Sequence, residues 1–184
     1  RIRIPNDSKS RAGGVLYSDY SLGRFFAEAA RQPWFENTIF LVTADHCASS
    51  AGRTEIPLQK YHIPALILAP GLIEPGVVDG IVSQIDLMPT LLSLLNMSYD
   101  SHFYGRSIFD PAYVNRAFIA TYQDLGYLEG DTFTILSPVR RFEQYRVVPT
   151  EENPHHLEAM ERKDAVQVDR AIGYYQTSCK WNKR

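Results

Sequence analysis

The sequence predicts an α/β layer followed by a smaller β-rich C-terminal part. Two apolar runs, residues 38–44 and 63–69, lie between stretches with helical spacing. Short strand-like runs then follow one another after residue 111, ahead of a last helical stretch. The chain has 184 residues, enough to bury a core. We therefore divide it into an α/β part, 1–110, and a β-rich and helical part, 111–184.

The first predicted element is a helix. Ser18 or Asp19 can cap it, and helical spacing relates Tyr17, Tyr20, Phe25 and Ala29. We expect this helix to run to about Ala30, because Pro33 cannot continue it.

Two strands and a helix are expected next. The run TIFLVTA, 38–44, shows no polar alternation, which is typical of a strand covered on both faces, as in a parallel sheet. A polar loop, 48–60, separates it from the second run, 63–69. Asp86 can cap a helix that runs to about Leu95.

The C-terminal part is expected to hold three short strands and a helix. The strands are predicted at 118–122, 133–136 and 144–148. The last two are spaced for an antiparallel hairpin around Ser137-Pro138. Helical spacing returns from 166 to about 180.

Composition excludes several classes of protein. A formal net charge of −2 indicates neither a nucleic-acid partner nor a polybasic membrane surface. No apolar run approaches the ~18 residues that would span a bilayer. Cys47 and Cys179 are too few for a disulfide framework, and either two thiols or a single bridge fits the sequence.

The chemically interesting feature is the Asp45-His46 pair at the end of the first strand. In open α/β sheets, functional groups gather beyond the carboxyl ends of strands. If both side chains turn into one pocket, a carboxylate oxygen and an imidazole nitrogen become two ligands for a divalent cation. Alternatively, Asp45 caps the next turn and His46 is an ordinary loop residue.

His62 precedes the second strand and is the next candidate. If the two strands are neighbours, the intervening loop returns His62 toward Asp45, where it can bind a metal or hydrogen-bond an oxyanion. Lys60 can add positive charge for a phosphate, although a solvated lysine fits as well.

Other candidates have weaker support. Cys47 is a possible soft ligand, but the role of a small buried apolar residue fits it better. Arg53 and the pair Arg140-Arg141 can meet an anionic head group, or simply be solvated. His155 and His156 receive no role.

Four blocks of sequence carry a family resemblance. They are YSDYSLGRFF, PWFENTIFLVTADHCASSAG, KYHIPALILAPG and SQIDLMPTLLSLL, in this order. Together they resemble the C-terminal part of the lipoteichoic acid synthase-like phosphoglycerol transferases, within the sulfatase and alkaline phosphatase superfamily. The resemblance covers residues 17–95 closely and extends through YQDLGYLEGD and ILSPVRRFEQYR.

The resemblance implies a fold, a chemistry and a location. The fold is the C-terminal portion of an alkaline phosphatase-like doubly wound sheet with a small β-rich addition. Asp45 and His46 match the metal-binding pair of the family, with manganese expected first and zinc possible, and His62 matches a histidine near the substrate phosphate. A phosphoglycerol-type group would pass from a phospholipid-type donor to an envelope glycan acceptor, on the extracytoplasmic side of the cell inner membrane.

The resemblance also implies parts that this sequence does not match. Relatives carry a glutamate ligand and a nucleophilic threonine upstream, and Thr38 and Thr43 do not match that threonine. We therefore expect a C-terminal fragment whose partner is the rest of its own chain, with its upstream half and membrane helices. Alone, the fragment is expected to be inactive and to bind metal weakly.

Two other functions remain open. A sulfatase or phosphodiesterase would use the same fold to hydrolyse its substrate. A pseudoenzyme or interaction module would keep the fold and bind no metal.

Overall fold

The computed structural model describes residues 10–47 and 56–181. The chain forms two compact units. The first unit comprises Arg1–Val42 and Ala65–Gly76, and the second comprises Thr43–Pro64 and Val77–Arg184.

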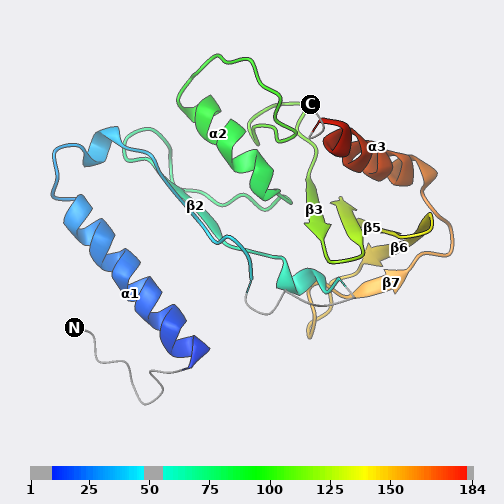
Figure 1. Cartoon of the computed structure of the whole chain (residues 1–184). Helices are drawn as coiled ribbons and strands as arrows, with labels where there is room; N and C mark the ends of the chain where they lie inside the picture. The colour runs from blue at the N-terminus through cyan, green and yellow to red at the C-terminus, as the bar shows by residue number, and fades with distance from the viewer. Residues whose placement is uncertain (1–9, 48–55, 182–184) are drawn as a thin grey trace. The chain divides into compact units, whose positions relative to one another are not determined.

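The first unit begins with helix α1, Arg11–Ala29 (Figure 1). Ser10 caps this helix, because its Oγ accepts a hydrogen bond from the amide of Gly13 at 3.0 Å. The predicted caps, Ser18 and Asp19, are therefore wrong, and both lie inside the helix. Glycines lie at the start of the helix. Because glycine is a poor helix former, residue propensities do not predict these first turns.

Strands β1, Phe40–Thr43, and β2, Ala65–Leu68, form a two-stranded sheet. The ring of Phe40 packs against other aromatic rings of its unit. Its centroid lies 5.4 Å from that of Phe26 and 5.4 Å from that of Phe35. The short helix η1, Phe35–Asn37, holds Phe35 there. Both strands match the prediction, but neither is covered on both faces by the described residues, and Leu66 is 51% exposed.

The end of β1 lies beside the beginning of β2. The amide of Ala44 donates to the carbonyl of Pro64 at 3.4 Å, and the hydroxyl of Thr43 donates to the same oxygen at 3.1 Å. The two ends of the loop between the strands are therefore held together, as the prediction for His62 requires.

In the second unit, helix α2, Leu87–Leu94, follows a short helix, η3, Gln84–Asp86. Ser83 and Asp86 form a capping box around η3. Asp86 occupies the N-cap position of α2, as predicted, but its side chain makes no capping bond to that helix.

Asp86 instead forms a buried ion pair with Arg116, whose Nη1 lies 3.0 Å from Oδ2. The Asp86 side chain is fully buried and that of Arg116 is 3% exposed. The carboxylate also accepts bonds from the Tyr113 hydroxyl and from the amides of Ser83 and Arg106. Burial opposes the charge of Arg116, but hydrogen bonds to Asp86 and its negative charge raise the pKa of the guanidinium.

The rest of the second unit is built on a five-stranded antiparallel sheet in the order β3-β4-β5-β6-β7. Its strands are Arg116–Ala120, Leu125–Glu129, Thr132–Ser137, Arg141–Val147 and Leu157–Ala159. The predicted β5–β6 hairpin is confirmed, and its turn places Val139 and Arg140 at positive φ, 62° and 57°. The sequence analysis missed β4 and β7.

Helix α3, Ala165–Trp181, covers one face of this sheet, close to the predicted range (Figure 1). The hydroxyl of Tyr175 donates to the carbonyls of Ile119 and Gly126, at 3.0 and 2.8 Å. On the other face, Ile56 and Leu58 pack into a core with Ile119 and Phe133. The short helix η2, Leu58–Lys60, therefore anchors the end of the loop that carries His62.

Neither Cys47 nor Cys179 forms a disulfide. No helix in the described residues is long and apolar enough to cross a membrane. The division at residue 110 stays a prediction.

Candidate functional site

The candidate site begins where β1 ends. Its backbone is held by Gln84, whose amide Nε2 donates to the carbonyl of Ala44 at 3.0 Å and reaches that of Asp45 at 3.5 Å. Together with the bonds to Pro64, this contact fixes the turn from which the side chains of Asp45 and His46 project.

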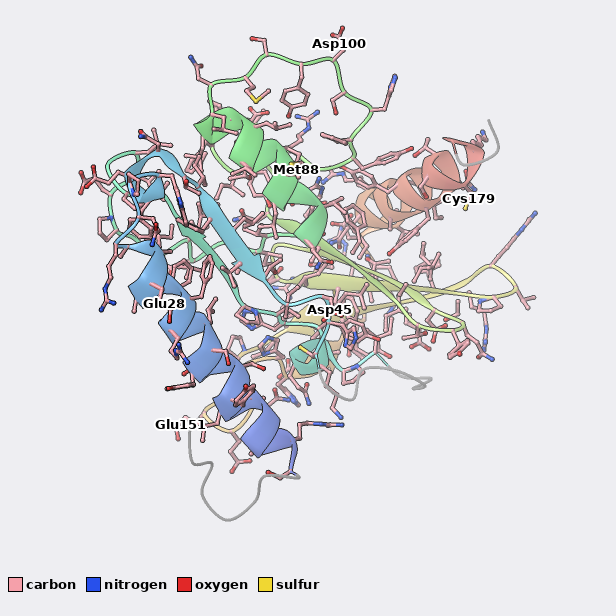
Figure 2. All side chains as sticks on the ribbon, turned by 60° about the vertical axis from the view of Figure 1, so that its left-hand side comes forward. Glu28, Asp45, Met88, Asp100, Glu151 and Cys179 are labelled. Atoms are coloured by element: carbon pink, nitrogen blue, oxygen red, sulfur yellow. The ribbon has the colours of Figure 1, made fainter. Side chains whose placement is uncertain are left out.

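Asp45 and His46 turn toward each other. The amide of His46 donates to Oδ1 of Asp45 at 2.9 Å, and the ring Nε2 of His46 lies 3.5 Å from Oδ2 of Asp45. The side chains are 87% and 72% exposed, respectively. Figure 2 labels Asp45 at the end of the β1 ribbon. The structure therefore brings the predicted pair together on an open surface.

The second ring nitrogen of His46 fixes its tautomer. Nδ1 lies 3.0 Å from the carbonyl oxygen of Cys47, which can only accept a hydrogen bond. In the neutral ring the proton is thus placed on Nδ1, and Nε2 keeps its lone pair on the side of Asp45. A backbone carbonyl that orients a histidine in this way is a common feature of metal-binding sites.

The chemistry and the spacing of these two donors fit a divalent cation. Two ligands ~2.1 Å from a tetrahedral ion lie about 3.4 Å apart, and Oδ2 and Nε2 are separated by 3.5 Å. A carboxylate oxygen and an imidazole nitrogen suit manganese or zinc. In the described part of the chain, however, no group of three or more such ligands occurs. The pair supplies part of a metal site.

His62 is joined to this pair through Cys47. The thiol of Cys47 donates to the backbone carbonyl of His62 at 3.3 Å. On the other side of His62, the hydroxyl of Tyr61 reaches the carbonyl of Ala120 in β3 at 3.4 Å. His62 is thus held between the loop after β1 and the C-terminal sheet. Lys60, the last residue of η2, is half-buried beside it in sequence.

His155 is a residue that the sequence analysis missed. It lies in the connection between β6 and β7, and its ring centroid is 5.4 Å from that of His62, with the planes tilted by 46°. Burial, and then the charge of His62, lower the pKa of His155. No local signal marks this residue, because only the folding of the sheet brings it to His62.

Two of the three predicted arginines lie in the described part of the chain. Arg53 lies outside the described residues. Arg140 and Arg141 lie at the exposed β5–β6 turn, where Nε of Arg141 reaches the carbonyl of Pro138 at 3.5 Å. Their role toward an anionic head group stays a prediction.

A hollow of about 350 Å³ lies beside α2. It is lined by Pro89 and by residues of the following loop, among them Tyr99, Phe103 and Arg106. Neither the Asp45-His46 pair nor His62 lines it, so the candidate site does not depend on this hollow.

Comparison with known proteins places this fold in a class. A solved protein of the alkaline phosphatase superfamily from Vibrio parahaemolyticus superposes with a TM-score of 0.82 at 30% sequence identity, and the match covers 97% of this chain and 45% of that one. The predicted alkaline phosphatase-like α/β fold class is therefore confirmed.

The sequence profile of the Sulfatase family matches residues 6–97, half of the chain, and the chain belongs to this family. An arylsulfatase from Clostridium perfringens is 30% identical, over 53% of this chain and 22% of its own length. The chain thus spans less than half the length of either relative. Members of the superfamily typically depend on a divalent metal.

Proposed function

We propose that Asp45 and His46 are two ligands of a divalent cation in an enzyme that cleaves a phosphate or sulfate ester. The observation that carries this proposal is the 3.5 Å separation of Oδ2 and Nε2, with the proton of His46 held on Nδ1 by the carbonyl of Cys47. Manganese is the first expected ion and zinc the second, since both accept mixed oxygen and nitrogen ligands. The remaining ligands lie outside the described residues.

In this proposal each residue of the site has a separate chemical role. Asp45 and His46 hold the cation, which when bound lowers the pKa of a hydroxyl nucleophile and meets the charge of the transferred group. His62 donates a hydrogen bond to an oxygen of that group. Gln84 and Cys47 position these side chains through the backbone bonds described above.

The preferred reaction is phosphoglycerol-type transfer. The four blocks of sequence that resemble the lipoteichoic acid synthase-like transferases favour it, and they include both Asp45-His46 and His62. The donor would be a phospholipid and the acceptor an envelope glycan. The reaction would take place on the extracytoplasmic side of the inner membrane, with the nucleophile supplied by the rest of the full-length chain.

Hydrolysis of a sulfate ester is the second candidate. The match to the Sulfatase family and the similarity to an arylsulfatase favour it. The two reactions use the same pair of metal ligands. They differ in the nucleophile and in the chemical group that the enzyme accepts from its substrate.

The first experiment measures metal in the full-length protein. We expect about one bound divalent ion in the wild type and a large loss in Asp45→Asn, because one ligand is removed while the side-chain volume is kept. Asp79→Asn, a change at an exposed aspartate, is the matched control and should retain the ion. Equal metal in wild type and Asp45→Asn contradicts the assignment, and a metal-free wild type favours the pseudoenzyme.

The second experiment compares substrates. The full-length protein is assayed with a fluorescent glycerophospholipid and with an aryl sulfate, before and after chelation. Chelator-sensitive release of lipid supports the transferase, whereas chelator-sensitive release of the aryl alcohol supports the sulfatase. Turnover that survives both chelation and Asp45→Asn contradicts both.

A further inference from the structure

The connection between β6 and β7 is tightly bonded, and it holds His155 in place. The hydroxyl of Thr150 accepts a bond from the amide of Asn153 at 3.0 Å, and the amide of Thr150 donates to the Asn153 carbonyl at 3.0 Å. The side chain of Asn153 accepts from the amide of His155 at 2.9 Å. A side chain on such a loop is positioned before any ligand arrives.

One of the two ring nitrogens of His155 is inaccessible to solvent. Nδ1 is buried and has no hydrogen-bond partner in the structure. A protonated Nδ1 would be a buried donor without an acceptor, which is costly, so the proton is favoured on Nε2. Burial, and then the charge of His62, also lower the pKa of His155, which favours the neutral ring. His155 therefore offers an N–H donor through Nε2.

This donor stands beside His62, whose backbone is tied through Cys47 to the Asp45-His46 turn. His62 precedes the C-terminal sheet in the sequence, whereas His155 lies in the connection between its strands β6 and β7. Paired imidazole donors suit the oxygens of a tetrahedral oxyanion such as phosphate or sulfate.

We propose that His155 is a further substrate-contacting residue, which with His62 forms a two-histidine site for an oxygen of the tetrahedral oxyanion. The inference rests on the proposed function for the identity of the ligand. It extends that function by assigning part of substrate recognition to the C-terminal sheet.

The test is binding of inorganic phosphate, and separately of inorganic sulfate, to the full-length protein. Binding is followed by calorimetry and by the imidazole NMR signals of protein labelled with ¹⁵N-histidine. In the wild type, the signals of His62 and His155 should shift together as phosphate is added, and that of the exposed neighbour His156 should not.

Variants separate recognition from folding. His155→Ala should weaken phosphate binding about tenfold, the effect of losing one hydrogen bond to an anion. His155→Gln keeps an amide N–H near the place of Nε2 and should restore most of that affinity. His156→Ala, the matched control, should bind as the wild type does. A double variant of His62 and His155 should lose less than the product of the single losses, since both contact one ligand.

Two results overturn the inference: wild-type affinity in a folded His155→Ala protein, or a His155 signal that phosphate does not move. Metal content and ester cleavage are measured on the same samples. A protein without metal or activity that still needs His155 for phosphate refutes the proposed function and keeps this inference. A metal-loaded, active protein that binds phosphate without His155 does the reverse.

Discussion

At the scale of single residues, Asp45 and Asp86 show how burial decides the role of a carboxylate. Asp45 is 87% exposed, and its Oδ2 faces a histidine nitrogen across a gap that suits a cation. Asp86 is fully buried, and donors from Ser83, Arg106, Tyr113 and Arg116 surround it. Asp45 has capacity left for a ligand, whereas Asp86 holds α2, the following loop and β3 together.

Replacing Asp86 with Asn should destabilise the protein strongly. Arg116 would remain buried without its counter-charge, and removal of one partner of a buried pair costs about 3–5 kcal/mol. Urea unfolding followed by circular dichroism measures the change. As a control, Arg146→Ala removes an exposed ion pair with Asp131 and should cost about 0.5 kcal/mol or less. Equal losses in the two variants would contradict the structural role of Asp86.

At the scale of elements, α3 is attached to the sheet through Tyr175. Its hydroxyl bonds to carbonyls of both β3 and β4. Burial raises the pKa of Tyr175 from 10.0 to about 12, and the bond to Ile119 opposes this rise. Because the pKa is higher in the folded than in the unfolded chain, the folded state keeps its proton over this range while the unfolded state loses it.

Stability should therefore be fully present below pH 10 and fall as the pH rises from about 10 to about 12. The contribution of Tyr175 to this slope is about 1.4 kcal/mol per pH unit. The free energy of unfolding, measured at several alkaline pH values, should have a shallower slope in Tyr175→Phe. Tyr122→Phe, a change at a 91% exposed tyrosine, should leave the slope unchanged. An unchanged slope in Tyr175→Phe would refute the attachment.

Local pattern predicted several of these elements and missed others for identifiable reasons. The runs that became β1 and β2 are apolar almost throughout, and aromatic or β-branched residues recur in β5 and β6, so short-range propensity agrees with the fold. Strand β4 contains Gly126, which weakens the strand pattern. The fold needs this glycine, because a Cβ there would lie 2.8 Å from the ring of Phe133. Strand β7 has three residues, too few for a period.

The same contrast holds for the candidate site. Asp45 and His46 are adjacent in sequence, and a strand end predicts that they share a surface, which the structure bears out in geometry. His62 required only that two neighbouring strands close a loop. His155 lies far along the chain and meets His62 through the packing of a whole sheet, which no periodicity encodes. Their chemical roles stay predictions.

At the scale of the whole molecule, the C-terminal sheet supports the candidate site. Leu58 is 4% exposed and lies in the core with Phe133 of β5, four residues before His62 in the sequence. The sheet therefore positions the segment that carries His62, while the turn after β1 positions Asp45 and His46.

Leu58→Ala should lower both stability and phosphate affinity. The cavity left in the core costs about 2–5 kcal/mol, and the support of His62 loosens with it. Val168→Ala is a control in α3, on the other face of the sheet, and should destabilise the protein without weakening phosphate binding at a temperature where both variants are folded. Calorimetric titration of each variant with phosphate measures the difference. Parallel losses of affinity would contradict the support by η2.

The packing of residues 56–61 against the sheet has a consequence for protein engineering. Chimaeras between relatives that exchange only the segment after residue 111 would separate Ile56 and Leu58 from the side chains that evolved around them. A graft that carries the short stretch before His62 along with the new sheet keeps both halves of that contact. Recombination boundaries in this family are thus better chosen by shared core than by position along the chain.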